Sequence, residues 1–505
     1  MIAICLDVGT SRTKCVAFDE DGNQVRVAET DTVVSHPSPG WSEQDMDGVV
    51  AAVAQVVREV VAGLDAPVDM VATTAQGDGL WLVDADGRPT GPALLWNDAR
   101  SASLVDRWEA EGRLDDAFAI NGSVGNAGLP NALLAWLHEH QADRVERAER
   151  ALTCNGWVHS WLTGEAVLDE SDACNPWFDV ARRTYAPELL DVFDLTWARR
   201  LLPAVRDDDH RVGSLLPSVA EDLGLPAGLP VVLAPYDVVS TALGAGATRP
   251  GQSSSILGTT LCTQTVLSQP DRGKPAQGMH LCSGVPDRWL RSYATLCGTE
   301  AIDWTCRLLG LADAGSLSDL AASAAPYGSV PGRTPLLLPY LSPAGERAPF
   351  RDSRARGSWL GLGLDVDRPT LARAVFEGLA FVLRECLLAA RVPVTELRVC
   401  GGGAASSLWC QVIADVTGVP AVRPVDTQSG AKGALVAACV ARGVDSDVDS
   451  AARRLVRTGR TFDPDPDAHE RYDAAYQQML ALRDDSRAHQ WPVLDAGAAA
   501  GPAVA

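Results

Sequence analysis

Two short stretches of this chain share one pattern, and this duplication limits the possible folds more than any other feature. In "CLDVGTSRTKCVAF" (5–18) and "SSSILGTTLCTQTVL" (253–267), an apolar run leads into Gly-Thr and then into a second apolar run. Each stretch is typical of a strand, a turn and another strand. The similarity is too short to be a solenoid repeat, so we expect two halves of similar design.

Strand-like runs alternate with helical patterns along the rest of the chain. Apolar residues recur at helical spacing in "MDGVVAAVAQVVREVVAGL", whereas "PVVL" forms a short strand-like run. This alternation predicts an α/β protein, and 505 residues suffice for two or three domains. A Gly- and Pro-rich passage at 244–251 separates the halves. We place a first domain at 1–247 and a second at 248–485, and expect a flexible tail at 486–505, where periodicity is lost.

Charge and cysteine content exclude several classes of protein. The chain has 43 basic and 65 acidic residues, a formal charge of −22, which argues against a nucleic-acid partner or an anionic membrane surface. The twelve cysteines show no CxxC pair, so we expect buried, reduced thiols. The N-terminal residues do not form a signal peptide, and no window has eighteen uninterrupted apolar residues. We therefore expect a cytoplasmic protein with no membrane partner.

The first turn has the composition of a phosphate-binding loop. Gly9 would allow close approach of an anion to the backbone, Thr10 and Ser11 would add hydroxyl donors, and Lys14 would add charge. Asp7 could hold Mg²⁺ through water, because this ion favours carboxylate and phosphate oxygens. The alternative is an ordinary hairpin with a salt-bridged rim.

The second turn repeats this chemistry with Gly258, Thr259 and Thr260. Neither turn has the GxxxxGK[ST] spacing of a P-loop. The pair of turns favours a different nucleotide-binding fold, in which two turns grip a polyphosphate.

A third glycine cluster, "CGGGAASSLW", follows a strand-like run and precedes a helical one. Bare glycines let a bulky ligand lie against the backbone, and a helix N-terminus favours negative charge. The cluster lacks the GxGxxG spacing of a dinucleotide site, so a dehydrogenase is a weak alternative. Tight packing between strand and helix is the other explanation.

Asp237 lies at the end of a strand-like run, beside the expected domain junction. A carboxylate at this place could accept the proton of a hydroxyl that attacks phosphorus. It could also cap the helix that "DVVSTALG" predicts.

A polar group with two tryptophans follows in "AQGDGLW" and "LWNDARS". Carboxylates and amides are suited to binding polyol hydroxyls, and an aromatic ring can cover the C–H face. The candidates are Gln76, Asp78, Trp81, Asn97 and Asp98. Turn and helix-cap chemistry is the alternative reading of these polar residues.

Taken in order, the motifs resemble the FGGY family of carbohydrate kinases over about residues 1–480. The matching segments are "DVGTSRTK", "SSSILGTT", "GGGAASSLWCQVIADVTGVP", "SGAKGALVAA", "LLPYLSPAGERAPFRDSRARGSWLGL" and "ARAVFEGLAF". The resemblance implies two ribonuclease-H-like domains of the actin, sugar kinase and Hsp70 type, which close over a cleft. The first would bind sugar and the second ATP.

The same resemblance implies roles for individual residues. Asp237 would activate the substrate hydroxyl, and Asp7 would lie on the magnesium side. Phosphate contacts are implied for Thr10, Gly258 and Thr259, and the adenosine site would be lined by Gly402, Gly403 and Ala404. ATP and Mg²⁺ are the expected cofactors.

The pocket motifs differ from those of xylulose kinases, in which Met and His usually stand where this chain has Gly77 and Asp78. The combination "TAQGDGLW" and "LWNDAR" resembles the erythritol kinase branch. We therefore expect a kinase for a small polyol, erythritol first and a xylulose or related pentulose second. An ATP-binding actin-like regulator without kinase activity is the rival from another class, and a homodimer is one assembly compatible with the sequence.

Overall fold

The computed structural model describes residues 1–206, 211–329 and 334–499. The chain divides into two compact units, each assembled from three segments. Unit 1 contains Met1–Pro250, Val266–Arg291 and Gln428–Arg457, and unit 2 contains Gly251–Thr265, Ser292–Thr427 and Thr458–Ala505.

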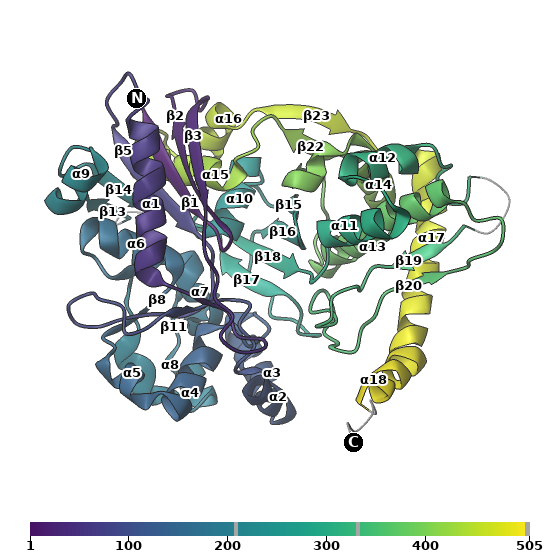
Figure 1. Cartoon of the computed structure of the whole chain (residues 1–505), viewed down its shortest axis with the longest axis horizontal. Coiled ribbons are helices and arrows are strands. Elements are labelled where there is room, and N and C mark those ends of the chain that lie inside the picture. Colours follow the sequence, from purple (N-terminus) through teal and green to yellow (C-terminus); the bar gives the residue numbers. More distant parts are fainter. Residues whose placement is uncertain (207–210, 330–333, 500–505) are drawn as a thin grey trace. The chain divides into compact units, whose positions relative to one another are not determined.

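Unit 1 is built on a six-stranded sheet with the order β13-β14-β5-β1-β2-β3 (Figure 1). β1 pairs parallel with β5, and β5 pairs parallel with β14. β1 pairs antiparallel with β2 through the hairpin that the sequence predicted, and β3 and β13 are antiparallel edge strands. The strand bounds are β1 Ala3–Val8, β2 Arg12–Phe18, β3 Gln24–Asp31, β5 Met70–Ala75, β13 Val212–Ser214 and β14 Pro230–Leu233.

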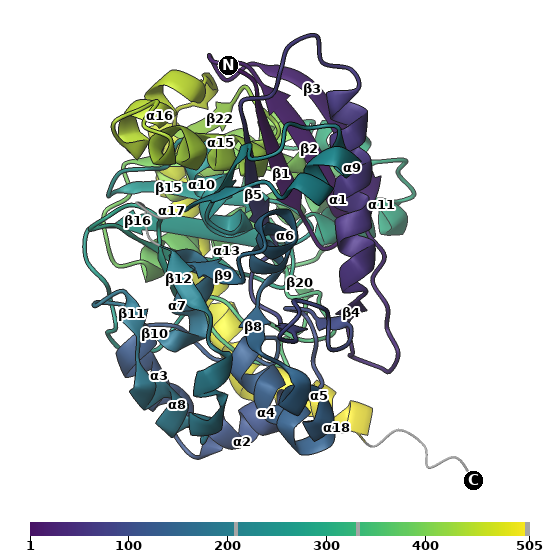
Figure 2. The same ribbon diagram turned by 90° about the vertical axis from the view of Figure 1, so that its left-hand side faces the viewer.

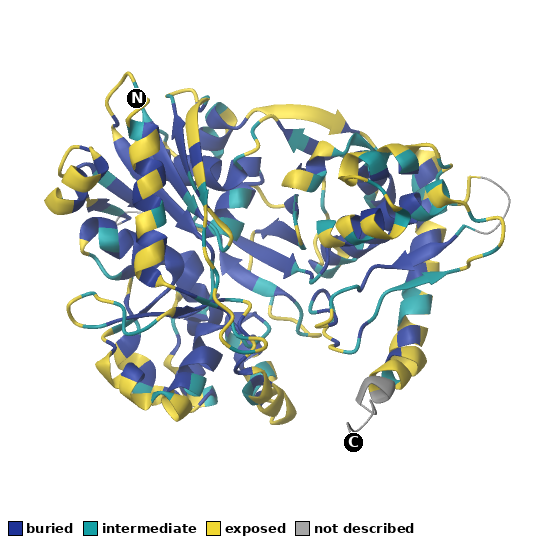
Figure 3. Cartoon of the chain, viewed as in Figure 1, coloured by how far each residue is buried: buried dark blue, intermediate teal, exposed yellow. Residues whose placement is uncertain are grey.

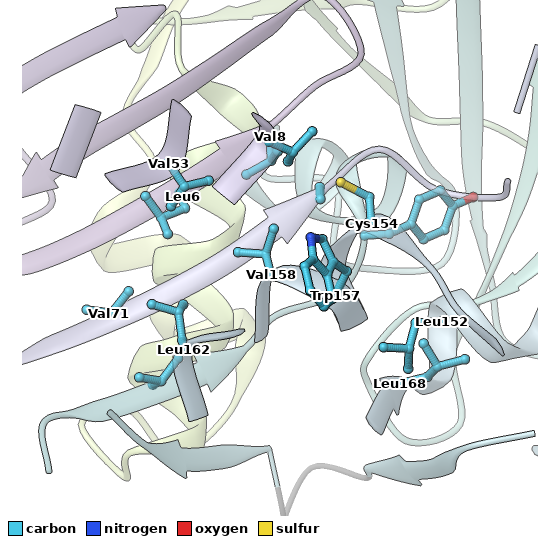
Figure 4. Packing of buried hydrophobic residues seen from close by; sticks show 14 of the residues in the cluster. Leu6, Val8, Val53, Val71, Leu152, Cys154, Trp157, Val158, Leu162 and Leu168 are labelled. Carbon is cyan, nitrogen blue, oxygen red and sulfur yellow. The ribbon is translucent and has the colours of Figure 1, made fainter. Parts of the chain in front are cut away.

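Helices cover both faces of this sheet (Figure 2). Successive side chains of a strand point to opposite faces. Ile4, Leu6 and Val8 of β1 pack into one cluster, with α1 (Met46–Val61) and α6 (Cys154–Thr163). Ala3 and Cys5 pack into another, with α10 (Asp237–Ala245), α15 (Ser429–Ala441) and α16 (Val448–Leu455). Both faces are therefore buried, and Figure 4 shows the packing on the α6 side.

Backbone packing joins α10 and α15 within unit 1. A Cβ at Gly433 would overlap the Ser240 carbonyl oxygen, and one at Gly244 would overlap the Ser429 carbonyl. Glycine is therefore required at both helix positions, because the two helices approach to backbone contact.

A smaller helical subdomain belongs to the same unit. Its core lies among short helices and two paired strands, and it includes Trp108, Leu133 and Leu189. Its elements are β6 Trp81–Val83, β8 Arg150–Leu152, α2 Ala102–Ala110, α3 Arg113–Asn121, α4 Pro130–His140, α5 Ala142–Arg147 and α8 Pro187–Val192. Helix α7 (Glu170–Trp177) belongs to the same unit.

Unit 2 repeats the strand order of unit 1. The seven-stranded sheet to which it contributes runs β17-β18-β16-β15-β21-β22-β23, where β17 is Met279–Cys282, and has an antiparallel β15–β16 hairpin, then two parallel neighbours and an antiparallel edge strand. The bounds are β15 Gln252–Leu257, β16 Leu261–Leu267, β18 Trp289–Ala294, β21 Glu396–Cys400, β22 Ala421–Pro424 and β23 Thr458–Phe462. The expectation of two similar α/β halves is confirmed.

Long helices form the core of unit 2. Phe376 of α13 (Arg368–Ala389) lies edge-on to Trp409 of α14 (Ser407–Thr417), with ring centroids 5.8 Å apart. α11 (Thr299–Leu309), α12 (Ala314–Ala322) and α17 (Pro466–Asp485) complete this layer. In Figure 3 the buried residues concentrate on the strands and on the inward faces of these helices.

The C-terminal segment differs from the expected tail. Residues 486–499 continue as the π-helical turn Ser486–Gln490 and α18 (Trp491–Ala499). Trp491 is buried, stacks on Phe350 at a centroid distance of 6.1 Å, and donates from Nε1 to the Arg356 carbonyl at 3.1 Å. Trp491, together with the ion pair between Arg487 and Asp352 at 3.3 Å, supplies the order that the sequence periodicity does not show. Residues 500–505 lie outside the described part of the chain.

All twelve cysteines are free and buried, as the sequence predicted. Within the described residues, no helix combines the length and the apolar character needed to cross a bilayer.

Candidate active site

The carboxyl ends of β1, β5 and β14 bring three predicted residues to one edge of the unit 1 sheet. Asp7 is near the end of β1, opposite Thr74 of β5. Gln76 directly follows β5, and Asp237 follows β14 as the first residue of α10. Parallel strands present their carboxyl ends at the same edge, where ligands of open α/β sheets commonly bind.

Asp237 has an environment suited to a base. The pKa of its carboxyl is raised from 3.8 to about 7, chiefly by burial and also by the charges of Asp7 and Asp78, whereas backbone N–H groups of Val238 and Gly77 oppose the shift. The Val238 N–H donates at 2.7 Å. The N-cap of α10 is Tyr236, so the alternative role of Asp237 as the cap is wrong.

The loop that carries Asp237 is fixed by buried hydrogen bonds. Thr74 and Ser240 both donate to the Pro235 carbonyl, at 2.6 and 2.5 Å. The Tyr236 N–H donates to Ser171 Oγ at 3.0 Å. These contacts from three elements hold the carboxylate in place before any ligand arrives.

Asp7 is partly buried, and its carboxylate accepts no hydrogen bond from the described residues. Burial raises its pKa, and the positive charge of Lys14 lowers it. Lys14 Nζ donates to Gln428 Oε1 at 3.2 Å. A Cβ at Gly430 would lie 2.5 Å from Asp7 Oδ2, so α15 starts directly beside this carboxylate.

This arrangement fits a magnesium ion that keeps most of its water. No group of three or more His, Cys, Asp or Glu side chains in the described ranges could hold a metal by itself. Mg²⁺ is commonly bound by one or two carboxylates together with substrate phosphates, and Asp7 and Asp237 offer two neighbouring carboxylates of this kind.

The remaining residues of the first turn are engaged differently. Gly9 closes the turn, with its N–H donating to the Arg12 carbonyl at 3.0 Å. Thr10 Oγ1 donates to Gln76 Oε1 at 2.6 Å and accepts from Trp96 Nε1 at 2.9 Å. Ser11 is exposed. The Thr10 hydroxyl thus links the turn to the polar group that follows β5.

The predicted substrate residues separate into two groups. Gln76 is buried between Thr10 and Gln44, to which its amide donates at 2.8 Å. Asp78 has a left-handed backbone with φ 54° and lies directly after Gly77, whose N–H reaches Asp237. Asp78 is near enough to the candidate base for its charge to act on Asp237, and Gln76 follows β5 at the same edge of the sheet.

The other three candidates have different surroundings. Trp81 belongs to the hydrophobic core and is 1% exposed. Asn97 is exposed. Asp98 is buried in an ion pair with Arg100 at 2.8 Å and also accepts from the Ser42 N–H at 2.7 Å. Its oxygens are thereby committed within the protein.

The need for glycine at position 77 is explained by the Tyr236 side chain, which packs against it. A Cβ at this position would overlap the Tyr236 ring. This contact gives a physical reason why the chain has glycine at the position where the sequence comparison with xylulose kinases expected methionine.

The second turn lies in unit 2, between β15 and β16. The Gly258 N–H donates to the Thr260 carbonyl at 3.2 Å, and the Gly258 carbonyl accepts from Thr299 at the start of α11 at 2.7 Å. A Cβ at Gly298 would lie 2.5 Å from the Gly258 carbonyl oxygen, so this turn packs tightly on the helix start. Thr259 is exposed.

The glycine cluster lies after β21, at the short 3₁₀ helix Gly402–Ala405. Gly402 is exposed, and a Cβ there would meet nothing within 4 Å. A Cβ at Gly403 would overlap Trp409, and Ala404 is buried. Of these three residues, Gly402 presents open backbone, whereas the other two pack against the core.

The sequence motifs did not single out two buried residues of α7. Asn175 donates from Nδ2 to Asp78 Oδ1 at 3.3 Å. Asp172 is 5% exposed, and burial raises the pKa of its carboxyl well above the usual value, with further contributions from Asp169 and Asp237. They lie about a hundred residues from Asp78, so no local pattern joins them.

Comparisons with known proteins agree with this geometry. The profile of the FGGY family of carbohydrate kinases, N-terminal domain, matches residues 2–244, and that of the C-terminal domain matches residues 254–442. An erythritol kinase of Brucella abortus (strain 2308) is 30% identical over 98% of this chain and 97% of its own. A xylulose kinase of Escherichia coli (strain K12) is 31% identical over 82% and 84%.

A solved structure, described as a xyloylose kinase from Brucella ovis, has a TM-score of 0.87 and 30% identity, and covers 97% of this chain and 100% of its own. The matched profiles together span most of the sequence, and the relatives align over most of their length. This chain therefore belongs to the FGGY family of carbohydrate kinases, phosphotransferases with an alcohol group as acceptor.

Proposed function

We propose that this kinase uses ATP and Mg²⁺ to phosphorylate a terminal hydroxyl of a small polyol, erythritol first. The observation that carries the proposal is Asp237, whose carboxyl has a pKa of about 7 beside the polar residues Gln76 and Asp78. At neutral pH a large fraction of this carboxylate is unprotonated and still basic enough to accept a proton.

The reaction balances with the groups of this chain. The acceptor hydroxyl attacks the γ-phosphorus of ATP, its proton goes to a carboxylate oxygen of Asp237, and ADP leaves. When bound, Mg²⁺ would neutralise phosphate charge, and Asp7 is the residue proposed to hold it. Lys14 and the backbone of Gly9, Thr10 and Ser11 are proposed as phosphate contacts, together with Gly258, Thr259 and Thr260, and the adenosine contacts are Gly402, Gly403 and Ala404.

The choice of a polyol rests on Asp78. A carboxylate accepts hydrogen bonds and donates none, so it suits a substrate that offers only hydroxyl groups. The similarity to an erythritol kinase over nearly the whole chain supports the same choice. The similarity to xylulose kinases makes xylulose, or a related pentulose or pentitol, the second candidate.

The test is ADP release measured with a coupled assay over a panel of polyols and ketoses. We expect erythritol to give the highest kcat/KM, and Asp237→Ala to abolish the stimulated rate. If neither polyols nor ketoses stimulate ADP release, the proposal is wrong. If xylulose exceeds erythritol, the polyol assignment is wrong although the kinase assignment stands.

A further inference from the structure

Asn175 is a buried amide with only half of its hydrogen-bonding capacity used. It lies in α7, but its backbone is non-helical, with φ −114° and ψ 112°, so the side chain leaves the helical direction. Its Nδ2 donates to Asp78 Oδ1 at 3.3 Å and lies 3.5 Å from Met279 Sδ. Its Oδ1 is buried and accepts no hydrogen bond from the described residues.

The pair Asp78–Asn175 is adjacent to the candidate base. The backbone N–H of Gly77 lowers the pKa of the Asp237 carboxyl, and Asp78, the next residue in the chain, raises it through its charge. The left-handed backbone of Asp78, between Gly77 and Gly79, turns its side chain out of the strand direction of β5. The Asp78 carboxylate, which accepts from the Asn175 amide, therefore lies close enough to the base for its charge to raise the pKa of Asp237.

An unmade hydrogen bond at a buried amide oxygen costs free energy, and native proteins keep few such groups without a reason. The missing partner of Asn175 Oδ1 must be a hydrogen-bond donor. Asp78 also presents acceptor oxygens, so the pair is matched by a hydroxyl group and opposed by a carbonyl, which has no hydrogen to donate.

On the basis of the function proposed above, we propose that Asp78 and Asn175 together determine acceptor specificity by binding a substrate hydroxyl and excluding a carbonyl. A substrate hydroxyl other than the one that attacks phosphorus donates to Asn175 Oδ1, and the Asn175 amide in turn fixes the orientation of the Asp78 carboxylate. The substrate class that this pair selects is a polyol with a hydroxyl group where a ketose has its carbonyl.

Two variants test the pair. Asn175→Ala removes the acceptor oxygen, and we expect the KM for erythritol to rise at least tenfold while the KM for ATP and kcat change less than threefold. Asp78→Asn preserves size and replaces one acceptor oxygen by an amide donor, so we expect the ratio of kcat/KM for erythritol to that for xylulose to fall at least tenfold. Because Asp78→Asn is isosteric, it carries the test if Asn175→Ala does not fold.

Asn121→Ala is the matched control. This buried amide donates to the Pro176 carbonyl, next to Asn175, at 3.2 Å and accepts from the Ser123 N–H at 2.9 Å. The Asn121→Ala variant perturbs the segment around Asn175 without removing an acceptor from the Asp78–Asn175 pair. The ratio of kcat/KM for erythritol to that for xylulose should therefore stay within threefold of wild type.

A binding measurement distinguishes this inference from the function on which it rests. In thermal unfolding, erythritol should protect wild type, and the protection should be lost in Asn175→Ala, whereas protection by ADP should be retained in both. If erythritol protects wild type and Asn175→Ala equally, the pair is not the determinant although the kinase proposal stands. If no polyol or ketose protects wild type against thermal unfolding, and wild type phosphorylates none of them, both proposals fail.

Discussion

Replacement of Asp237 by asparagine should stabilise the folded protein at pH 8 while it abolishes catalysis. The folded protein raises the pKa of this carboxyl from 3.8 to about 7. Unfolding therefore releases the carboxyl into water, where it ionises more easily. Above pH 7 the carboxyl is ionised in both states, and the folded state bears the full free-energy cost of keeping that charge buried. This pKa shift corresponds to a loss of about 4 kcal/mol in the free energy of unfolding for a group fully shielded from water.

The sign follows from proton linkage. Below about pH 4 the carboxyl is protonated in both states and costs nothing. Between pH 4 and pH 7 the unfolded state loses its proton first, so the stability of wild type falls as pH rises. Asparagine does not titrate, and because the Asp237 side chain is only partly buried we expect a gain of about 2 kcal/mol at pH 8.

The assay is urea unfolding of wild type and Asp237→Asn at pH 8.0 and pH 4.5, with the transition of unit 1 analysed separately because a two-unit protein can unfold in steps. Most of the gain should disappear at pH 4.5. The control is Asp98→Asn, which removes one of the two carboxylates paired with the buried Arg100, leaves the other, Glu43, in place, and should cost about 1–3 kcal/mol at pH 8. The reasoning is refuted if Asp237→Asn is no more stable than wild type at pH 8, or if its gain is the same at both pH values.

Three further predictions concern the same edge of the sheet. The kcat/KM of wild type should rise with pH up to about 7 and then level off, because Asp237 accepts a proton only when ionised; a flat profile from pH 5.5 to 8.5 would contradict this role. Gly430→Ala should fold, since alanine favours helix by about 1 kcal/mol, but its Cβ would displace Asp7 and raise the Mg²⁺ concentration for half-maximal activity at least fivefold; an unchanged Mg²⁺ titration counts against the metal assignment. Gly77→Ala should push Tyr236 aside, move the N–H that reaches Asp237 and lower kcat about tenfold, and normal turnover in a steady-state assay would show that the ring yields freely.

Much of the fold could be predicted because its signals are local. The Gly-Thr turns, the helical spacing in α1 and the position of Asp237 after a buried strand are each visible within about twenty residues. The strand order in both units then follows the duplication that the two hairpins suggested. The C-terminal segment shows the limit of this approach, because the buried contact between Trp491 and Phe350 joins residues far apart in the sequence.

The sequence by itself determined the duplicated α/β design, the family and the candidate base. Only the tertiary structure decided which partners the polar side chains of these loops have. Asp98 and Asp78 look alike as carboxylates in polar loops, yet Asp98 is paired with Arg100 whereas Asp78 accepts a hydrogen bond from Asn175, 97 residues away. The physical reason is that a side chain's chemistry depends on its burial and its partners, and these partners come from distant segments that no local periodicity records.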